Sequence, residues 1–299
     1  MSFSSNVKAE LCRQSITRRM EALAEAYGVL LYCNTFTGAA VRVVTESRDF
    51  AERLPKLFRK AFGVGFDATP DPDEPGKLLL AIEQKDKLER LLTALDMRAD
   101  GEVALHVNFG LLEEEPEQLA FFRGAFLAGG SVTDPAKRYH LELATPHLKV
   151  NAEASVLLRE IGFSAKETSR AGNSILYFKQ SDTIEDFLTA IGAQVSAMGV
   201  MEAKVEKDLR NGVNRRVNCE TANLSKAVDA SFEQLAAIRR LEEAGVLETL
   251  PQKLQETARL RKENPEATLS ELAEMPDPPV SKSAVNHRMR KLMELSKTL

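Results

Sequence analysis

The sequence predicts an α+β fold in which a unit of order α-β-β-α-β-β-α occurs twice and is followed by an all-α domain. The first observation is the stretch FFRGAFLAGGSV at 121–132. Gly124 and Ala128 stand four residues apart, so they share one helix face and allow another backbone to approach closely. The Gly129-Gly130 pair ends this predicted helix before an extended run.

The second observation is a matching stretch 102 positions earlier. Aligning Gly130 with Gly28 places Ala128 on Ala26 and Gly124 on Ala22. Two helices with small-residue faces, each followed by Gly and a strand, predict a tandem duplication packed about a pseudo-two-fold axis.

Hydrophobic periodicity and turn residues give the same order of elements in both halves. In the first half we expect helix to 27, strands 29–36 and 39–45, helix 49–62, strands 64–69 and 78–82, and helix 85–95. In the second half we expect helix 117–128, strands 131–133 and 139–144, helix 148–161, strands 163–168 and 174–179, and helix 183–191. Strand patterns stop at about 193. The predicted domains are the two repeats at 1–105 and 106–200, a helical hinge at 201–224 and a helix-turn-helix domain at 225–299.

Composition limits the classes of function. No run of 18 apolar residues is present to span a bilayer, and the N-terminus lacks the pattern of a secretion signal. Three cysteines without C-x-x-C spacing, and four scattered histidines, predict reduced thiols and no metal site. The net charge of −4 hides an asymmetry, because 281–299 has five basic residues against one acid, Glu294. The tail is therefore +4 and the rest about −8, so the C-terminus is the candidate nucleic-acid surface.

The segment 208–224 is rich in Asn and Arg. This composition favours a hinge whose side chains cap helix ends, with a contact to phosphate or a partner protein as the alternative. The candidates are Arg210, Asn214, Arg215, Arg216 and Asn218.

The last fifty residues have the pattern of a helix-turn-helix. A capping box at 268–271 begins a short helix, a Pro-rich turn follows at 276–279, and Ser281 caps a final helix to about 295. On a helical wheel Val285, Met289 and Leu292 share the inner side. The residues outside it are Lys282, Ser283, Asn286, His287, Arg288, Arg290 and Lys291. Arg and Asn suit base edges and Lys suits phosphate, so we predict binding to double-stranded DNA.

Three stretches, 122–132, 210–224 and 281–292, resemble the WhiA family of bacterial regulators, and the resemblance extends over nearly the whole chain. It implies two LAGLIDADG homing-endonuclease-like repeats and a C-terminal helix-turn-helix. It also implies DNA binding in the control of cell division, chromosome segregation and, in filamentous actinobacteria, sporulation. The Pro-rich turn departs from relatives, which tend to carry Gly there.

The resemblance raises the question of catalysis. LAGLIDADG nucleases place one carboxylate near the end of each central helix to share divalent metal. In the alignment above these positions are Tyr27 and Gly129, neither of which is an acid, and Glu25 lies two residues too early. We therefore expect no enzymatic activity, catalytic residue, metal, cofactor or small-molecule substrate.

The predicted strands are also poor in positive charge. The run 30–36 has no Lys or Arg, 39–45 has only Arg42, and 139–144 carries Glu142. This surface should bind DNA weakly and serve a protein partner in transcription control. We expect a cytoplasmic, nucleoid-associated protein without membrane contact, whose role is transcriptional or architectural. The alternative is a protein-interaction or small-ligand module with only non-specific nucleic-acid binding.

Overall fold

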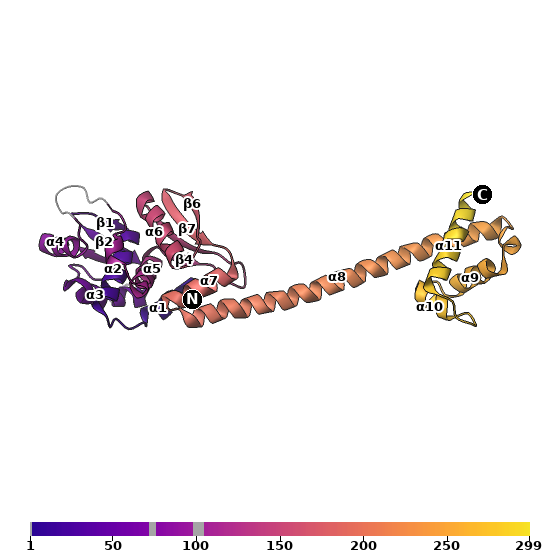
Figure 1. Ribbon diagram of the computed structural model, residues 1–299, viewed down its shortest axis with the longest axis horizontal. Helices are drawn as coiled ribbons and strands as arrows, with labels where there is room; N and C mark the ends of the chain where they lie inside the picture. The colour runs from indigo at the N-terminus through magenta and orange to yellow at the C-terminus, as the bar shows by residue number, and fades with distance from the viewer. Residues whose placement is uncertain (1, 72–75, 98–104) are drawn as a thin grey trace. The chain divides into compact units, whose positions relative to one another are not determined.

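The computed structural model describes residues 2–71, 76–97 and 105–299 and divides into two compact units, Met1–Asp208 and Leu209–Leu299 (Figure 1). The boundaries predicted for the two repeats and the hinge stay predictions. In the first half of the first unit the elements are α1 (Phe3–Cys12), α2 (Arg19–Tyr32), β1 (Thr35–Phe36), β2 (Val41–Thr45), α3 (Arg48–Phe62), β3 (Leu78–Ile82) and α4 (Lys85–Ala94). A 3-10 turn (Phe109–Leu111) leads into α5 (Glu115–Gly129), β4 (Gly130–Val132), β5 (Leu141–Thr145), α6 (Leu148–Glu160), β6 (Lys166–Arg170), β7 (Asn173–Phe178) and α7 (Ser181–Ile191).

The second half has the predicted order α-β-β-α-β-β-α, and its strands form one antiparallel sheet of order β4-β5-β7-β6. The first half forms a three-stranded sheet, β1-β2-β3. The strand predicted at 64–69 is wrong, because only a single bridge joins Ala68 to Ala81. Asp67 fixes this segment instead, since its carboxylate accepts hydrogen bonds from the backbone N–H groups of Glu83 and Gln84 at 2.7 and 2.8 Å. Asp67 thus satisfies free N–H donors where α4 begins. Part of the turn expected between these strands, 72–75, lies outside the described residues.

The two central helices, α2 and α5, lie side by side with their backbones in contact (Figure 1). A Cβ atom added to Gly124 would lie 1.9 Å from the carbonyl oxygen of Glu25, and one added to Gly28 would lie 2.0 Å from that of Phe121. The two sites mirror each other, because Glu25 and Phe121 each stand three residues before the glycine of their own helix. Gly28 is therefore the counterpart of Gly124.

The predicted pairing of helices is right, but its register is wrong. The repeat offset is 124 − 28 = 96 residues, not 102, and Gly28 lies inside α2 rather than at its end. The strand expected at 29–36 shrinks to Thr35–Phe36, because α2 continues to Tyr32. Residues 29–32 are all buried, and a fully buried apolar run gives no period that separates helix from strand.

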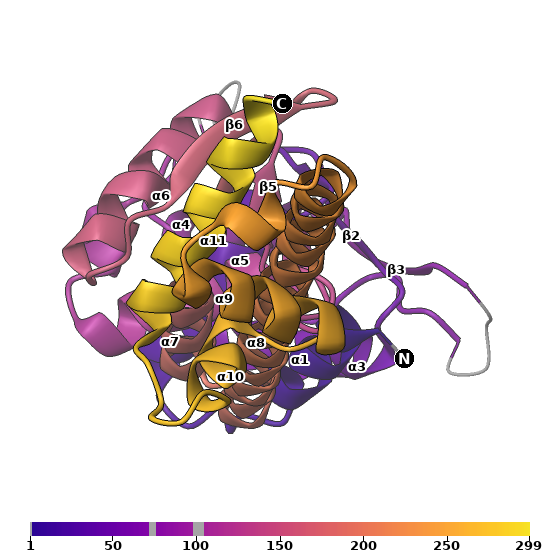
Figure 2. The same ribbon diagram turned by 90° about the vertical axis from the view of Figure 1, so that its right-hand side faces the viewer.

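The second unit contains the end of α8 (Gln194–Glu243), a 3-10 turn (Leu247–Thr249), α9 (Gln252–Glu263), α10 (Leu269–Glu274) and α11 (Lys282–Lys297). α11 packs against both α9 and α10 (Figure 2). The predicted capping box is present: the Thr268 hydroxyl accepts from the Glu271 N–H, and the Glu271 carboxylate accepts from the Thr268 N–H at 2.7 Å. The core of this unit is built from all four helices, with Ile238, Leu241, Leu254, Ala258, Leu272, Ala273, Val285, Met289 and Leu292 buried.

The close contact of α2 with α5 predicts the effect of a single methyl group. Gly124→Ala places a Cβ against the Glu25 carbonyl and should lower the free energy of unfolding of the first unit by about 1–3 kcal/mol. Urea denaturation followed by circular dichroism measures it. Gly212→Ala is the control, because Gly212 sits in a helix with open space around it and should gain stability by roughly 0.5–1 kcal/mol. Equal midpoints for Gly124→Ala and the wild type would contradict the contact.

Candidate nucleic-acid interface

α11 is anchored by its inner side. The Ser281 hydroxyl accepts a hydrogen bond from the Ala284 N–H at 3.2 Å, which confirms it as the N-cap. Val285, Met289 and Leu292 are buried to within 2% of full coverage, as the helical wheel predicted. The inner side is thereby fixed against α9 and α10, and the polar side of the helix faces solvent.

The predicted DNA-contacting residues are distributed along that polar side. Lys282, Ser283, His287, Arg290 and Lys291 are exposed. Asn286 is half-buried at the edge of the same side. One helix therefore presents two hydroxyl or amide groups, an imidazole and three cations without a nearby acid until Glu294.

Arg288 differs from this set. Its guanidinium turns toward α9 and donates to the Thr257 hydroxyl at 3.4 Å, and the residue is half-buried. Its position beside the exposed face was predicted from the wheel alone, which does not show which way a long side chain folds. Arg288 thus has a packing role in the structure besides any contact to phosphate.

Sequence reasoning missed Arg261 in α9. It is 2% exposed and donates through one terminal nitrogen to the carbonyl oxygen of Ala267 at 2.6 Å, with longer contacts to those of Asn264 and Pro265. Burial lowers its pKa from the usual value. Arg261 holds the loop between α9 and α10 and so positions the short helix that precedes α11. The sequence did contain a signal for this burial, because Arg261 follows Ala258 by one helical turn and so lies on the same inner side of α9.

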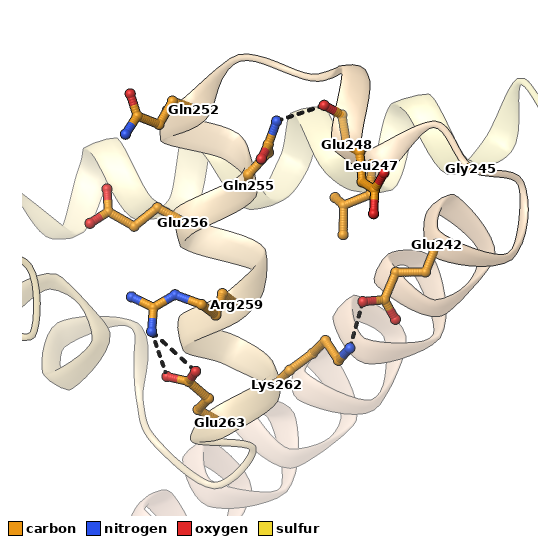
Figure 3. A pocket seen from close by; sticks show the side chains of 10 residues that line it. All are labelled: Glu242, Gly245, Leu247, Glu248, Gln252, Gln255, Glu256, Arg259, Lys262 and Glu263. Atoms are coloured by element: carbon orange, nitrogen blue, oxygen red, sulfur yellow. Dashed lines mark hydrogen bonds and ion pairs between the residues drawn. The ribbon is translucent and has the colours of Figure 1, made fainter.

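A hollow of about 820 Å³ between the end of α8 and α9 has the opposite electrostatic character (Figure 3). Lys262 pairs with Glu242 at 2.5 Å, and Arg259 pairs with Glu263 at 3.1 Å. Glu248 and Glu256 add two further carboxylates to its lining. With its cations already paired, this acidic hollow is no surface for a nucleic acid.

The Asn- and Arg-rich segment lies within one uninterrupted helix, α8, and its side chains therefore do not cap helix ends as expected. All five candidates are exposed: Arg210, Asn214, Arg215, Arg216 and Asn218. At about 100° per residue, Asn214, Arg215 and Asn218 lie on one side of the helix. Val213 and Val217 lie opposite Arg215, with Asn214 and Asn218 between them, and all of these residues are exposed.

The two arginines on the sheets of the first unit are both paired with carboxylates. Arg42 on β2 is bound by Glu83 at 2.7 Å, and Arg170 on β6 by Glu142 at 2.8 Å. Val44 and Leu79 stand opposite each other in the sheet register and are 37% and 44% exposed. The β1-β2-β3 sheet thus exposes apolar side chains beside a paired arginine, which is a poor surface for phosphate binding.

The positions of the nuclease carboxylates need one correction. With the offset of 96, the counterpart of Gly129 is 129 − 96 = 33, so Cys33 replaces Tyr27 as the first position. Tyr27 is buried within the unit, where its hydroxyl donates to the His106 carbonyl and accepts from the Asn108 N–H. Cys33 is buried, its thiol donates to the carbonyls of Leu30 and Thr35 at 3.2 Å, and burial raises its pKa to about 12. A protonated thiol is no ligand for a hard cation.

The Glu25 carboxylate is occupied by ion pairs with two arginines. Its carboxylate receives two hydrogen bonds from Arg53, at 2.6 and 2.8 Å, and a third from Arg123 at 3.3 Å. Glu25 and Arg53 are 2% and 4% exposed, so the ion pair is buried beside the crossing of α2 and α5. Through Arg53 and Arg123, the Glu25 carboxylate connects α2 to α3 and to α5. Removing Arg53 or Glu25 would leave the other charge buried and uncompensated. In the described part of the chain no group of three or more His, Cys, Asp or Glu residues is arranged to hold a metal.

The burial of Cys33 makes its reactivity a test of this arrangement. Thiol modification by Ellman's reagent at pH 8 proceeds through the thiolate, which the raised pKa of Cys33 suppresses. Cys219, exposed on α8, should react first, and Cys33 only on unfolding. Cys219→Ser should remove the fast phase. Two fast equivalents in a folded Cys12→Ser chain, in which only Cys33 and Cys219 remain, would show that Cys33 is accessible.

Comparison with known proteins shows which family the chain matches. The model of the WhiA LAGLIDADG-like domain matches residues 118–210, and that of the WhiA C-terminal HTH domain matches residues 213–296. A protein of Clostridium perfringens named "Probable cell division protein WhiA" is 35% identical over 311 residues, covering 100% of this chain and 98% of its own length. One of Alkaliphilus metalliredigens with the same name is 37% identical and covers 99% and 98%.

Solved structures match the fold. The crystal structure of full-length DUF199/WhiA from Thermatoga maritima has a TM-score of 0.61 at 22% identity and covers 100% of this chain and 99% of that one. In the described residues, no helix is long and apolar enough to cross a membrane. Two family models match in succession, relatives above 30% identity match over nearly their whole length, and the fold is shared, so this chain belongs to the WhiA family.

Proposed function

We propose that this protein binds double-stranded DNA through α11 and acts as a regulator in the control of cell division. The observation that carries the proposal is the outer side of α11, where Ser283, Asn286, His287 and Arg290 lie between Lys282 and Lys291. Arg and Asn form bidentate pairs with guanine and adenine in the major groove, which is wide enough for an α-helix. The relatives' name supports the cellular process. Chromosome segregation, sporulation and a nucleoid-associated place in the cytoplasm belong to the same proposal.

A second contact involves α8. Arg215, flanked by Asn214 and Asn218, points away from the exposed valines of α8, and Arg210 and Arg216 lie closer to those valines. These five residues are proposed as an accessory contact to the phosphate backbone, where amides and guanidinium groups position a protein without specifying sequence.

The first unit is proposed as a platform for a protein partner in transcription control. The exposed Val44 and Leu79 and the paired cations Arg42 and Arg170 support a protein surface over a DNA saddle. The replacement of paired carboxylates by Cys33 and Gly129 supports a role without catalysis. The competing function is an interaction module whose basic tail binds nucleic acid without sequence preference.

Substitutions in α11 distinguish the two. Arg290→Ala and Asn286→Ala should each cost roughly 1–3 kcal/mol at the specific site, which genome-wide occupancy mapping in the native host would identify, and should relax base preference there. Lys282→Ala and Lys291→Ala should weaken binding to all sequences alike. Each should flatten the slope of log K against log salt by about one unit. Fluorescence anisotropy on specific and random duplexes measures both effects.

The two groups of variants must separate. If all four lose the same affinity on specific and random duplexes, α11 holds only phosphate, and the alternative function is favoured. Glu266→Ala, on the loop before α10, is the control and should leave both affinities unchanged.

Absence of catalysis is tested directly. Because Cys33 and Gly129 supply no carboxylate, the full chain with Mg²⁺ or Mn²⁺ should leave supercoiled plasmid uncut. Nicking that follows the protein through purification and stops on chelation would contradict this proposal without affecting DNA binding by α11.

A further inference from the structure

The outer face of the β4-β5-β7-β6 sheet carries two aromatic side chains next to each other. Leu143 and Leu176 point to the opposite face, where they join the core beneath α6. Because side chains alternate along a strand, Glu142 and Tyr177 face outward, and they stand opposite each other in the register. The centroids of the Tyr177 and His140 rings are 5.6 Å apart, and the ring planes are tilted by 39°. Both residues are half-buried, so each ring is seated in the sheet and partly open to solvent.

Basic residues surround this aromatic pair. Lys166 of β6 stands opposite Tyr177 in the register and therefore shares its face. The Nζ atom of Lys179 lies 5.1 Å from the centroid of the Tyr177 ring. Lys137 and Arg138 lie in the loop that leads into β5. All four basic residues are exposed, and within the described part of the chain none of them forms an ion pair with a carboxylate.

The Glu142 carboxylate on this face is neutralised by its neighbours. Arg170 of β6 donates to one carboxylate oxygen at 2.8 Å, and the Ser131 hydroxyl donates to the same oxygen at 3.3 Å. The other oxygen lies 3.3 Å from Nε2 of His140. Glu142 thereby holds the His140 ring beside Tyr177 and adds no free negative charge. The sheet presents a pair of aromatic rings within a net positive surface.

We propose that this aromatic face, formed by Tyr177, His140, Lys166 and Lys179, binds single-stranded nucleic acid. An unpaired base has a flat π face that stacks on a tyrosine or histidine ring, and lysines alongside neutralise the phosphates between successive bases. Neighbouring strands of a sheet are about 4.8 Å apart, so rings on two adjacent strands can receive two successive bases. RNA and single-stranded DNA share this chemistry. A duplex does not, because its bases are already paired and stacked on one another.

The other sheet of the first unit differs in its chemistry. On the outer face of β2 and β3, Arg42 stands opposite Ala81, and Val44 stands opposite Leu79. None of these four residues has a ring, and the one cation among them is paired with Glu83. This difference favours a ligand that covers a single sheet, such as an extended single strand, over a duplex held between two equivalent sheets.

Fluorescence anisotropy with labelled ligands of about 12 nucleotides tests the aromatic face. The full chain carries Lys282→Ala, Arg290→Ala and Lys291→Ala, so that α11 contributes little affinity for any nucleic acid. The ligands are oligo(U), oligo(dT) and a random duplex of the same length. At least one single strand should bind about 5-fold or more tightly than the duplex, and the tighter of the two identifies RNA or DNA. Equal affinity for all three ligands, or tightest binding to the duplex, would overturn the inference without affecting the proposal for α11.

Further substitutions in the same chain separate stacking from charge. Tyr177→Leu keeps an apolar side chain in the sheet but removes the ring, and should weaken single-strand binding at least about 5-fold. Tyr177→Phe is the conservative variant that restores the ring and should restore the affinity. Lys166→Gln should flatten the slope of log K against log salt by about 0.7 unit, whereas Lys60→Gln, the same change on α3, should leave the slope unchanged. Full affinity in Tyr177→Leu, or an equal loss in Tyr177→Phe, would overturn the inference.

Photochemical cross-linking locates the contact in the wild-type chain. A single strand with 5-iodouracil at one position reacts with an aromatic ring that stacks on that base. Mass spectrometry of tryptic peptides should find the adduct on Tyr177 or His140. Tyr27 and Tyr32 are buried and serve as internal controls that should not react. An adduct confined to His287 of α11 would overturn the inference.

Discussion

The first unit depends on the absence of two Cβ atoms. Gly28 and Gly124 let α2 and α5 approach until each glycine lies against a backbone carbonyl of the other helix. Large side chains around this contact, Tyr27, Phe121 and Phe122 among them, are then fully buried and join the two halves into one core. The Glu25 carboxylate bridges Arg53 of α3 and Arg123 of α5 beside the same crossing. Dispersion and ionic contacts both rely on the short distance between the helices.

The parts of this fold that depend on local sequence patterns could be predicted from the sequence, whereas those that depend on contacts between distant segments could not. The duplication, the small-residue faces and the second repeat followed from glycine placement and strand alternation, which are local. The offset of 96 did not, because small residues at 22, 26, 28, 124 and 128 allow several alignments that only contact between backbones can distinguish. The strand expected at 64–69 failed for a related reason: a single carboxylate, Asp67, gives its segment a better partner at α4 than a sheet edge does.

At the candidate site, too, the local pattern was predicted correctly and the contacts with other helices were not. The wheel placed Val285, Met289 and Leu292 correctly, since an amphipathic helix with a cap at Ser281 specifies its own inner side. It did not show that Arg288 folds back onto Thr257 or that Arg261 is buried beneath the following loop. Long cationic side chains have apolar stems and a charged end, so their final direction depends on carbonyls and hydroxyls contributed by other helices.

The continuity of α8 restricts how its length can change in related chains. An α-helix turns by about 100° per residue, so inserting or deleting one residue between Val217 and Leu224 would rotate the exposed side chains of Val213 and Val217 by that angle relative to those of Leu224 and Val228. Changes of 7, 11 or 18 residues come close to whole turns and would keep these four side chains on one side of the helix. Among homologues, insertions and deletions in this helix should therefore occur in those lengths, while the loops of the first unit vary freely.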